Sequence, residues 1–253
     1  MQAASSLADV HSGYNRMVCM FSIIIPAHNE AVELPETLAH AFAAARAQDM
    51  AFEVLVVDDA STDATATLAR DGGARVVSVN HRQIGATRNA GARAARGRVL
   101  VFVDADTRLH ARTLHAALRA VDAGAIGGGS AVRFEEPVSA WARWSVSMWN
   151  ALAHALGWAA GCFVFVDRRA FEAVGGFDER YFAAEEIVLS RALRRRGRFV
   201  ILRETVTTSA RKTRTVASMA PHWRVLWKII TSRGSALHRR DELGLWYEQR
   251  KEP

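Results

Sequence analysis

Two carboxylates, Asp104 and Asp106, follow directly after the apolar run from Val99 to Val103. Two negative charges one residue apart repel each other unless a cation or strong hydrogen-bond donors compensate them. Mg²⁺ and Mn²⁺ take oxygen ligands from one or two carboxylates and complete their shell with substrate phosphates. The pair therefore predicts a divalent metal site that bridges to a diphosphate, and a turn or a helix cap is the competing interpretation.

Polar residues also end two earlier apolar runs. The segment from Pro26 to Glu30 (PAHNE) ends the first run, and the segment from Asp58 to Ser61 (DDAS) ends the second. Ligands of open parallel sheets bind beyond the carboxyl ends of the strands, so we expect both segments to meet Asp104 along one edge. At the end of the second segment and just after it, Ser61, Thr62 and Asp63 are expected only to cap the next helix.

Arg88 lies between two glycines, Gly85 and Gly91, near an expected helix start. Backbone groups and the guanidinium can approach a nucleotide together there, although an ordinary surface arginine is the alternative. Glu185 and Glu186 begin a later helix, where the helix dipole alone favours acidic residues. These residues become informative only in combination.

The elements that position these residues read as alternating strands and helices. Expected strands are Phe21 to Pro26, Val54 to Val57, Arg75 to Val79 and Val99 to Val103, with helices from near Leu34, from Ala64 to Arg70 and from Ile84 to Arg96. Later segments read as strands at Ala125 to Phe134, Cys162 to Val166, Phe199 to Leu202 and Thr205 to Ser209, and as helices at Val138 to Leu156 and Glu185 to Arg196. Strands that are apolar on both faces and alternate with helices predict an α/β fold with a mostly parallel sheet that becomes mixed and carries helices on both faces.

Composition favours one large domain with an anion-attracting surface. The chain has 253 residues, 50% hydrophobic side chains and a formal net charge of +7, which suits nucleotide phosphates, nucleic acid or an anionic membrane. Much of the excess lies between Arg191 and Arg214, so we expect a localised anion site, with solvated helix faces as the alternative. Nucleic-acid binding is not expected, because the basic residues cluster on the catalytic side of the chain without a recognition motif.

The remaining composition predicts a cytoplasmic protein. Cys19 and Cys162 lie far apart in apolar surroundings, so neither a disulfide nor a zinc site is indicated and a reducing compartment is expected. Residues 1–20 lack a signal-peptide pattern and read as a flexible extension, and no apolar run is long enough to span a bilayer. A peripheral contact with the inner face of the membrane remains open.

The order of the motifs resembles one known family. PAHNE, VDDAS, GATRNAG and VFVDADT are followed by the segments from Gly161 to Arg169 and from Val174 to Glu179, and then by Glu185-Glu186. Together they resemble the short, non-processive, inverting members of the family 2 glycosyltransferases over about Phe21 to Lys212. The resemblance implies the Rossmann-like nucleotide-diphospho-sugar transferase fold, GT-A, with a donor half (21–107), an acceptor half (108–215) and a helical basic tail (216–253).

The resemblance also implies roles for individual residues. The metal, Mn²⁺ or Mg²⁺, would be bound by Asp106 and Asp104, and Glu186 would be the general base, with Glu185 as its alternative. The family commonly has Glu-Asp where this chain has Glu185-Glu186, so the carboxylate stands about one bond further out. Donor-binding roles are implied for Pro26, Ala27, Glu30, Asp59, Arg88, Asp104 and Lys212.

The implied function is metal-dependent, inverting transfer of one sugar, of hexosyltransferase type, from a nucleotide-diphosphate sugar to an acceptor hydroxyl. The acceptor is a glycan, a small molecule or a lipid-linked molecule. No Gln-x-x-Arg-Trp segment of the processive members is present, which favours single addition. The alternatives are a catalytically impaired nucleotide-sugar-binding protein of the same fold and a nucleotidyltransferase, although PAHNE is no glycine- and lysine-rich phosphate loop.

A tryptophan-rich helix is the last feature to interpret. Trp141, Trp144, Met148 and Leu152 recur at helical spacing, and such a stripe usually packs in a core. The alternatives are an aromatic platform for a sugar or lipid acceptor and a helix that lies in a membrane interface.

Overall fold

The computed structural model describes residues 20–135 and 140–209. An eight-stranded sheet forms its centre, in the order β3-β2-β1-β4-β7-β6-β8-β5. The strands are β1 (Met20–Ala27), β2 (Ala51–Asp59), β3 (Arg75–Val79), β4 (Val99–Val103), β5 (Thr107–Arg108), β6 (Gly127–Phe134), β7 (Phe163–Asp167) and β8 (Phe199–Thr208). The helices are α2 (Leu34–Arg46), α3 (Thr65–Asp71), α4 (Ile84–Ala94), α5 (Ala111–Asp122), α6 (Ala140–Leu156), α7 (Arg168–Ala173) and α8 (Glu185–Arg194).

The sheet is parallel in its first half and mixed in its second. Strands β1 to β4 run parallel to one another, whereas β7 lies antiparallel between β4 and β6. Strand β8 pairs with β6 in parallel and with β5 antiparallel. The predicted change from a parallel to a mixed sheet is confirmed.

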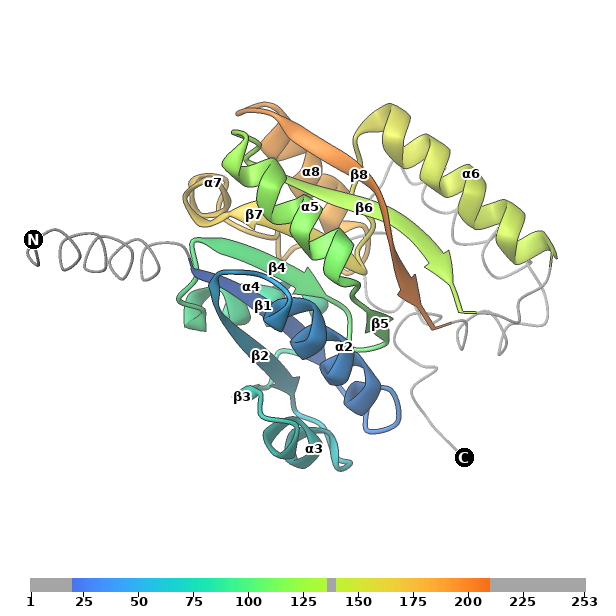
Figure 1. The fold of residues 1–253 in the computed structure, drawn as a ribbon. Helices are drawn as coiled ribbons and strands as arrows, with labels where there is room; N and C mark the ends of the chain where they lie inside the picture. The colour runs from blue at the N-terminus through green and yellow to red at the C-terminus, as the bar shows by residue number, and fades with distance from the viewer. Residues whose placement is uncertain (1–19, 136–139, 210–253) are drawn as a thin grey trace, which may run out of the picture.

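Helices cover both faces of the sheet, as Figure 1 shows. Alternate residues of β1 face opposite sides: Ile23 and Ile25 belong to the core beneath α2 and α5, and Ile24 to the core beneath α4, α7 and α8. Because both sides of the strand are fully buried, its sequence is a continuous apolar run and does not alternate. The predicted two-sided α/β architecture is confirmed.

The prediction of two separate extended segments late in the chain was wrong. The extended segments expected at Phe199 to Leu202 and Thr205 to Ser209 are one strand, β8, whose register against β6 shifts between Ser130 and Ala131. A β-bulge of this kind adds residues to one strand without ending it, which a sequence pattern cannot distinguish from a break.

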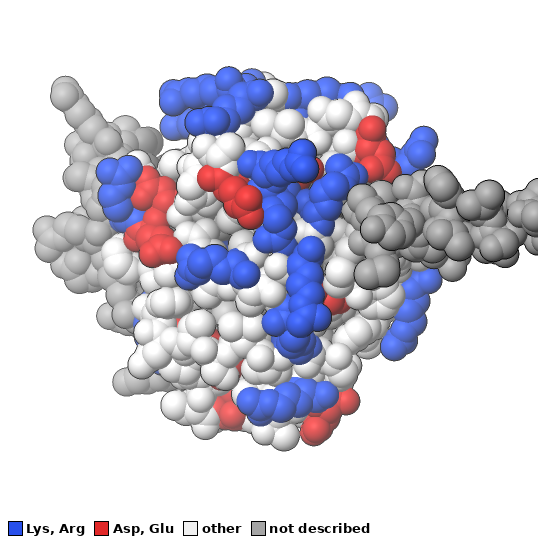
Figure 2. Space-filling model, turned by 90° about the vertical axis from the view of Figure 1, so that its left-hand side faces the viewer, with Lys and Arg blue, Asp and Glu red and all other residues white. Residues whose placement is uncertain are grey.

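Arg198, in the arginine-rich segment after α8, lies away from the carboxylates of Asp104 and Asp106. It precedes β8, and the strand registers bring the start of β8 to the same end of the strands as Arg98, which precedes β4, and Arg168, which follows β7. Asp104 and Asp106 follow the opposite end of β4. Figure 2 looks onto the end of the strands that lies away from Asp104 and Asp106 and shows basic side chains gathered there, all of them arginines, since the described residues include no lysine. The expectation that the late basic residues cluster on the catalytic side is wrong for Arg198 and its neighbours.

No helix in the described ranges is both long and apolar enough to cross a bilayer.

Candidate functional site

The candidate site lies where β1, β2 and β4 end and β7 begins. Val103 at the end of β4 pairs with Phe163 at the start of β7, so the residues after one strand lie beside those before the other. The chain turns after β4 through a bond from the Thr107 amide to the Asp104 carbonyl, 3.0 Å long. This turn sets Asp104 and Asp106 at the edge, and Asp106 is buried.

A single guanidinium, that of Arg88 on α4, joins this edge to α8. Its Nη1 donates to Glu185 Oε1 at 2.6 Å, and its Nη2 donates to Asp104 Oδ1 at 2.7 Å and to the Gly161 carbonyl at 2.8 Å. The ring of Phe177 lies 5.3 Å from its central carbon, within cation–π range. Arg88 is only 2% exposed, so the alternative of an ordinary surface arginine is wrong.

Carboxyl groups outnumber cationic groups around Arg88 in the described part of the chain. Burial raises the pKa of Glu185 although Arg88 acts in the opposite direction. Burial and the neighbouring charge of Glu185 raise the pKa of the half-buried Glu186 to about 8. Among the described residues Glu186 forms no ion pair, whereas Glu185 is paired with Arg88. The two carboxylates therefore differ: Glu185 is fixed by a cation, and Glu186 is the more basic group.

Residues at the start of α4, near Arg88, form hydrogen bonds with other parts of the site. Thr87 Oγ1 donates to Asp59 Oδ2 at 2.8 Å. Asn89 exchanges two hydrogen bonds with the backbone of Phe177, each 2.9 Å long. Gln83, which caps α4, donates to the Tyr181 carbonyl at 2.6 Å. One helix start thus holds the end of β2 and the segment that leads to α8.

Asp59 holds the loop between β3 and α4. Its carboxylate accepts from the amides of His81, Arg82 and Gln83 at 2.6, 2.9 and 3.3 Å. Burial alone would raise its pKa, but these bonds and the one from Thr87 outweigh burial and lower it. Asp59 is an ionised anchor that fixes the shape of the edge beside β2.

The other predicted donor-binding residues lie close to this anchor. Pro26 and Ala27 end β1 in register with Val57 and Asp58, and Glu30 is buried and bound through its amide to Thr65 Oγ1 at 2.8 Å. Asp58, to which the sequence analysis gave no role of its own within the DDAS segment, has a buried Oδ1 without a hydrogen-bond partner in the described part of the chain. A ligand that donates a hydrogen bond there would remove the cost of that unmade bond. Lys212 lies outside the described residues.

The predicted helix caps proved only partly right. Asp63 Oδ1 accepts from the Thr65 amide at 2.9 Å at the start of α3, as a capping residue does. Ser61 and Thr62 instead bind Asn29: Ser61 Oγ accepts from the Asn29 amide at 3.0 Å, and the Thr62 amide donates to Asn29 Oδ1 at 2.8 Å. They tie the β1 and β2 ends together rather than cap α3.

Backbone strain gathers around the same site. Asn29, Ala60, Arg82 and Ala184 have φ values of 53°, 56°, 52° and 61°, in the left-handed region that costs a side-chain-bearing residue about 1–2 kcal/mol. Asn29 lies in the PAHNE segment and Ala60 follows Asp59. Arg82 lies in the loop that Asp59 holds, and Ala184 precedes Glu185. Such strain persists where the surrounding contacts over-determine the backbone, which is common at functional sites.

Asp104 and Asp106 fit a metal that binds together with a phosphate ligand. The described residues contain no group of three or more His, Cys, Asp or Glu side chains arranged to hold an ion. A Mg²⁺ or Mn²⁺ ion that takes one or two carboxylates and otherwise binds substrate phosphates and water needs no such group. Two carboxylates would thus supply only part of such an ion's ligands, and the metal role of Asp104 and Asp106 stays a prediction.

The tryptophan-rich helix is not a simple core helix. Val146 and Trp149 pack against the core, but Trp144, Met148 and Leu152 are 54%, 53% and 44% exposed. The expectation that this stripe packs in the core is wrong for these three residues. The side chain of Trp141 lies outside the described part.

Comparisons with known proteins agree with the motif order. Residues 22–175, well over half of the chain, match the family model for Glycosyl transferase family 2. The undecaprenyl-phosphate 4-deoxy-4-formamido-L-arabinose transferase of Pseudomonas aeruginosa (strain LESB58) is 33% identical over 162 residues, which are 60% of this chain and 48% of that protein. The 4,4'-diaponeurosporenoate glycosyltransferase of Staphylococcus haemolyticus is 38% identical over 96 residues, 35% and 24% of the two chains. The chain spans about half the length of the first of these relatives.

Solved structures share the fold. The mannosyltransferase PcManGT from Pyrobaculum calidifontis, in complex with GDP-Man and Mn²⁺, has a TM-score of 0.63 at 22% identity, over 86% of this chain and 62% of that one. Glucosyl-3-phosphoglycerate synthase from Mycobacterium tuberculosis, in complex with Mn²⁺, UDP and glucosyl-3-phosphoglycerate, has a TM-score of 0.60 at 18% identity, over 84% and 79%. The predicted GT-A fold is confirmed.

Replacing Arg88 with methionine is expected to lower the free energy of unfolding by about 3–5 kcal/mol, because removing one partner of a buried ion pair leaves the other charge uncompensated. Urea denaturation at pH 7 measures this loss. The deficit should shrink as the pH falls, since protonated Glu185 needs no cation. Arg93→Met, on the exposed face of the same helix, is the matched control and should cost less than about 0.5 kcal/mol. Equal losses for the two variants would contradict the account.

Proposed function

Because the chain belongs to glycosyl transferase family 2, we propose that it transfers one sugar from a nucleotide-diphosphate donor to an acceptor hydroxyl, with inversion at the anomeric carbon. The observation that carries this proposal is the buried Arg88, which binds Asp104 after β4 and Glu185 at the start of α8. Arg88 thereby holds the end of β4, where we place the diphosphate and the metal, close to the carboxylates of Glu185 and Glu186. A reaction of this kind requires both of these sites.

The donor is proposed to lie along the ends of β1, β2 and β4. The backbone at Pro26 and Ala27, with Glu30 and Asp59, would hold its base and ribose, and Arg88 and Lys212 would assist. The diphosphate would be bound through Asp106 and Asp104 by Mn²⁺ or Mg²⁺, which supplies positive charge beside the departing phosphate oxygen. The gathering of carboxyl groups where β4 ends and α8 begins supports this cation, because Mg²⁺ and Mn²⁺ take oxygen ligands from carboxylates and from substrate phosphates.

Glu186 is the proposed general base. In the reaction the acceptor oxygen forms a bond to the anomeric carbon, the bond from that carbon to the β-phosphate oxygen breaks, and the acceptor proton moves to Glu186. The nucleoside diphosphate leaves with the electron pair of the broken bond. The raised pKa of Glu186 supports this role, because the ideal catalytic pKa lies near the operating pH.

Glu185 is proposed to position Glu186 rather than to accept the proton. Its carboxylate is 4% exposed and bound to Arg88, so a proton on it would weaken the ion pair. Ala184, with its left-handed backbone, precedes it and sets the direction in which α8 starts.

The length of the Glu186 side chain favours one alternative. Where the family resemblance leads us to expect aspartate, the longer side chain could displace the carboxylate and leave a nucleotide-sugar-binding protein with impaired catalysis. The ion pair between Arg88 and Glu185 would be retained in either case. An active transferase and an impaired one would therefore differ in turnover and not in donor binding. No observation favours a nucleotidyltransferase.

The acceptor is proposed to be lipid-linked. The relative from Pseudomonas aeruginosa is named for undecaprenyl phosphate and the one from Staphylococcus haemolyticus for 4,4'-diaponeurosporenoate, and both of these molecules are terpenoids. A cytoplasmic protein that contacts the inner membrane face peripherally would meet such acceptors.

Donor binding should depend on Asp106 and on a divalent metal together. A nucleoside diphosphate at 100 times its dissociation constant stabilises a protein by about 2.7 kcal/mol, so thermal shifts with UDP or GDP plus Mn²⁺ reveal the donor's base. Asp106→Asn keeps the side-chain shape but removes charge, and the extra shift given by Mn²⁺ should disappear. Asp122→Asn, at an exposed ion pair with Arg98, should retain it. An unchanged shift in Asp106→Asn would refute the assigned metal role.

Turnover should depend on Glu186 and on pH. Glu186→Gln should lower kcat by about 10²–10⁴-fold, the usual contribution of a general base, with little change in donor binding. Because the base acts in its ionised form and its pKa is raised, kcat/KM of the wild type should increase with pH up to about 8, and this dependence should vanish in the variant. Glu185→Gln, the matched variant one residue away, should keep the pH dependence at lower activity. If only Glu185→Gln removes the pH dependence, Glu185 is the base.

A further inference from the structure

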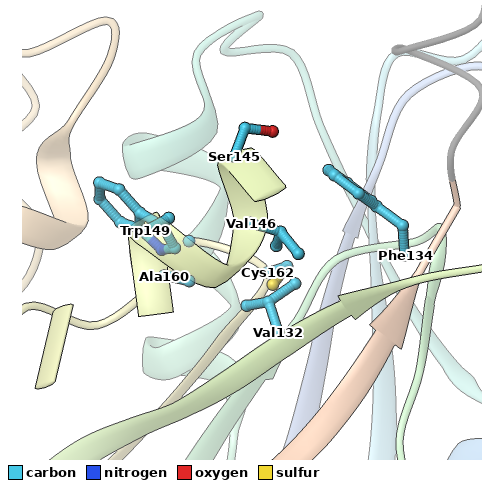
Figure 3. A pocket seen from close by; sticks show the side chains of 8 residues that line it. Val132, Phe134, Ser145, Val146, Trp149, Ala160 and Cys162 are labelled. Atoms are coloured by element: carbon cyan, nitrogen blue, oxygen red, sulfur yellow. The ribbon is translucent and has the colours of Figure 1, made fainter. Parts of the chain in front are cut away.

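An apolar pocket lies between α6, β6 and the segment before β7. It has a volume of about 310 Å³ and opens to the surface. Figure 3 shows the side chains that line it. They are Val132 and Phe134 from β6, Ser145, Val146 and Trp149 from α6, and Ala160 and Cys162 ahead of β7, together with the backbone of Gly161. None of these residues carries a formal charge.

The pocket shares a wall with the proposed catalytic site. Gly161 lines the pocket, and its carbonyl accepts from Arg88 Nη2 at 2.8 Å. A Cβ placed on Gly161 would lie 3.4 Å from the carboxyl carbon of Glu186. The next residue, Cys162, lines the pocket and accepts at its carbonyl from the Asp104 amide at 3.3 Å. One short segment thus separates apolar surface from Glu186 and Asp104.

The polar groups in the pocket wall do not make it a polar binding site. Cys162 contributes a small side chain that packs as an apolar group with only a weak S–H donor. Ser145 is the one hydroxyl among the eight lining residues. A sugar ring or a phosphate would lose its hydration here with few hydrogen bonds in return, which is costly.

The size of the pocket limits what it holds. A volume of about 310 Å³ is at the lower end of the roughly 300–1,000 Å³ of small-molecule sites. It suits a short branched hydrocarbon segment or one ring, and not a whole long-chain lipid. On the same helix, Trp144, Met148 and Leu152 are exposed, so α6 carries apolar surface outside the pocket as well as inside it.

We propose that this α6 pocket receives the apolar segment of the acceptor that adjoins the accepting oxygen, and that it selects acceptors with an isoprenoid-like skeleton over polar ones. The inference rests on the proposed function, because the continuity of the pocket with Glu186 matters only if Glu186 activates the acceptor. The accepting oxygen would lie past Gly161, beside Glu186, while the hydrocarbon contacts Val146, Trp149 and Phe134.

Farnesol and farnesyl phosphate test the proposal, with glycerol and glycerol phosphate as polar partners carrying the same head groups. The assay measures release of the nucleoside diphosphate by the full-length protein in the presence of Mn²⁺. The donor is a nucleotide sugar whose nucleoside diphosphate gives the largest thermal shift. We expect one or both farnesyl compounds to be used with kcat/KM at least about tenfold above the matching polar compound, an effect of the size that one or two buried methylene groups produce. The two farnesyl arms distinguish an alcohol acceptor from a lipid phosphate.

Val146→Phe fills the pocket from α6 with an apolar side chain. We expect it to raise KM for the farnesyl acceptor by about tenfold or more and to leave the nucleotide thermal shift unchanged. Met148→Phe, two residues away on the exposed side of α6, is the matched control and should behave as the wild type. If Val146→Phe lowers the melting temperature, Val146→Thr, which keeps the shape and adds a hydroxyl, replaces it and should also raise KM.

The outcomes separate the two proposals. A wild type that shows no thermal shift with any nucleoside diphosphate plus Mn²⁺ and transfers to no acceptor overturns the proposed function, and with it this inference. A wild type that binds donor through Asp106 but prefers the polar compounds overturns the pocket assignment alone. A KM for farnesyl acceptors that is the same in Val146→Phe, Val146→Thr and Met148→Phe also overturns it.

Discussion

The buried guanidinium of Arg88 is the constraint on which the rest of the site depends. It binds Asp104 after β4, Glu185 at the start of α8 and the carbonyl of Gly161 before β7, three points that are far apart in the chain. A charge only 2% exposed must keep its partners, so the position of α8 relative to the sheet edge is fixed. The helix that carries Arg88 also fixes Asp59 through Thr87 and the Phe177 segment through Asn89.

In the described part of the site, this arrangement gathers several carboxyl groups around one guanidinium. We propose that the end of β4 binds a divalent cation together with a diphosphate. Burial and the neighbouring Glu185 raise the pKa of Glu186, so it keeps its proton to a higher pH than an ordinary glutamate. Three of the described arginines, Arg98, Arg168 and Arg198, lie at the opposite ends of these strands, away from the carboxyl groups of the site.

The sequence predicts those parts of the fold and site that depend on local pattern. The apolar runs that end in PAHNE, VDDAS and VFVDADT give the strands and their common edge, because strand ends are marked by the change from apolar to polar residues. Contacts between residues far apart in the chain cannot be predicted from local pattern. Nothing local to Arg88 reveals that it binds Glu185 across 97 residues, and Ser61 and Thr62 look like helix caps until Asn29 lies beside them. The α6 pocket likewise depends on the packing of α6 against β6, and a helical stripe such as Trp144, Met148 and Leu152 has the same pattern whether it is buried or exposed.

The central claim is that one base, Glu186, activates the acceptor for a single direct displacement at the anomeric carbon. Proton NMR of the product during the first turnovers tests it most directly, because the anomeric coupling constant reports the configuration of the transferred sugar before any equilibration. The account predicts that an α-linked donor gives a β-linked product, and that the glycoside forms with this configuration from the start. Formation of an α-linked product would contradict it, since one direct displacement from the face opposite the leaving group inverts the anomeric carbon.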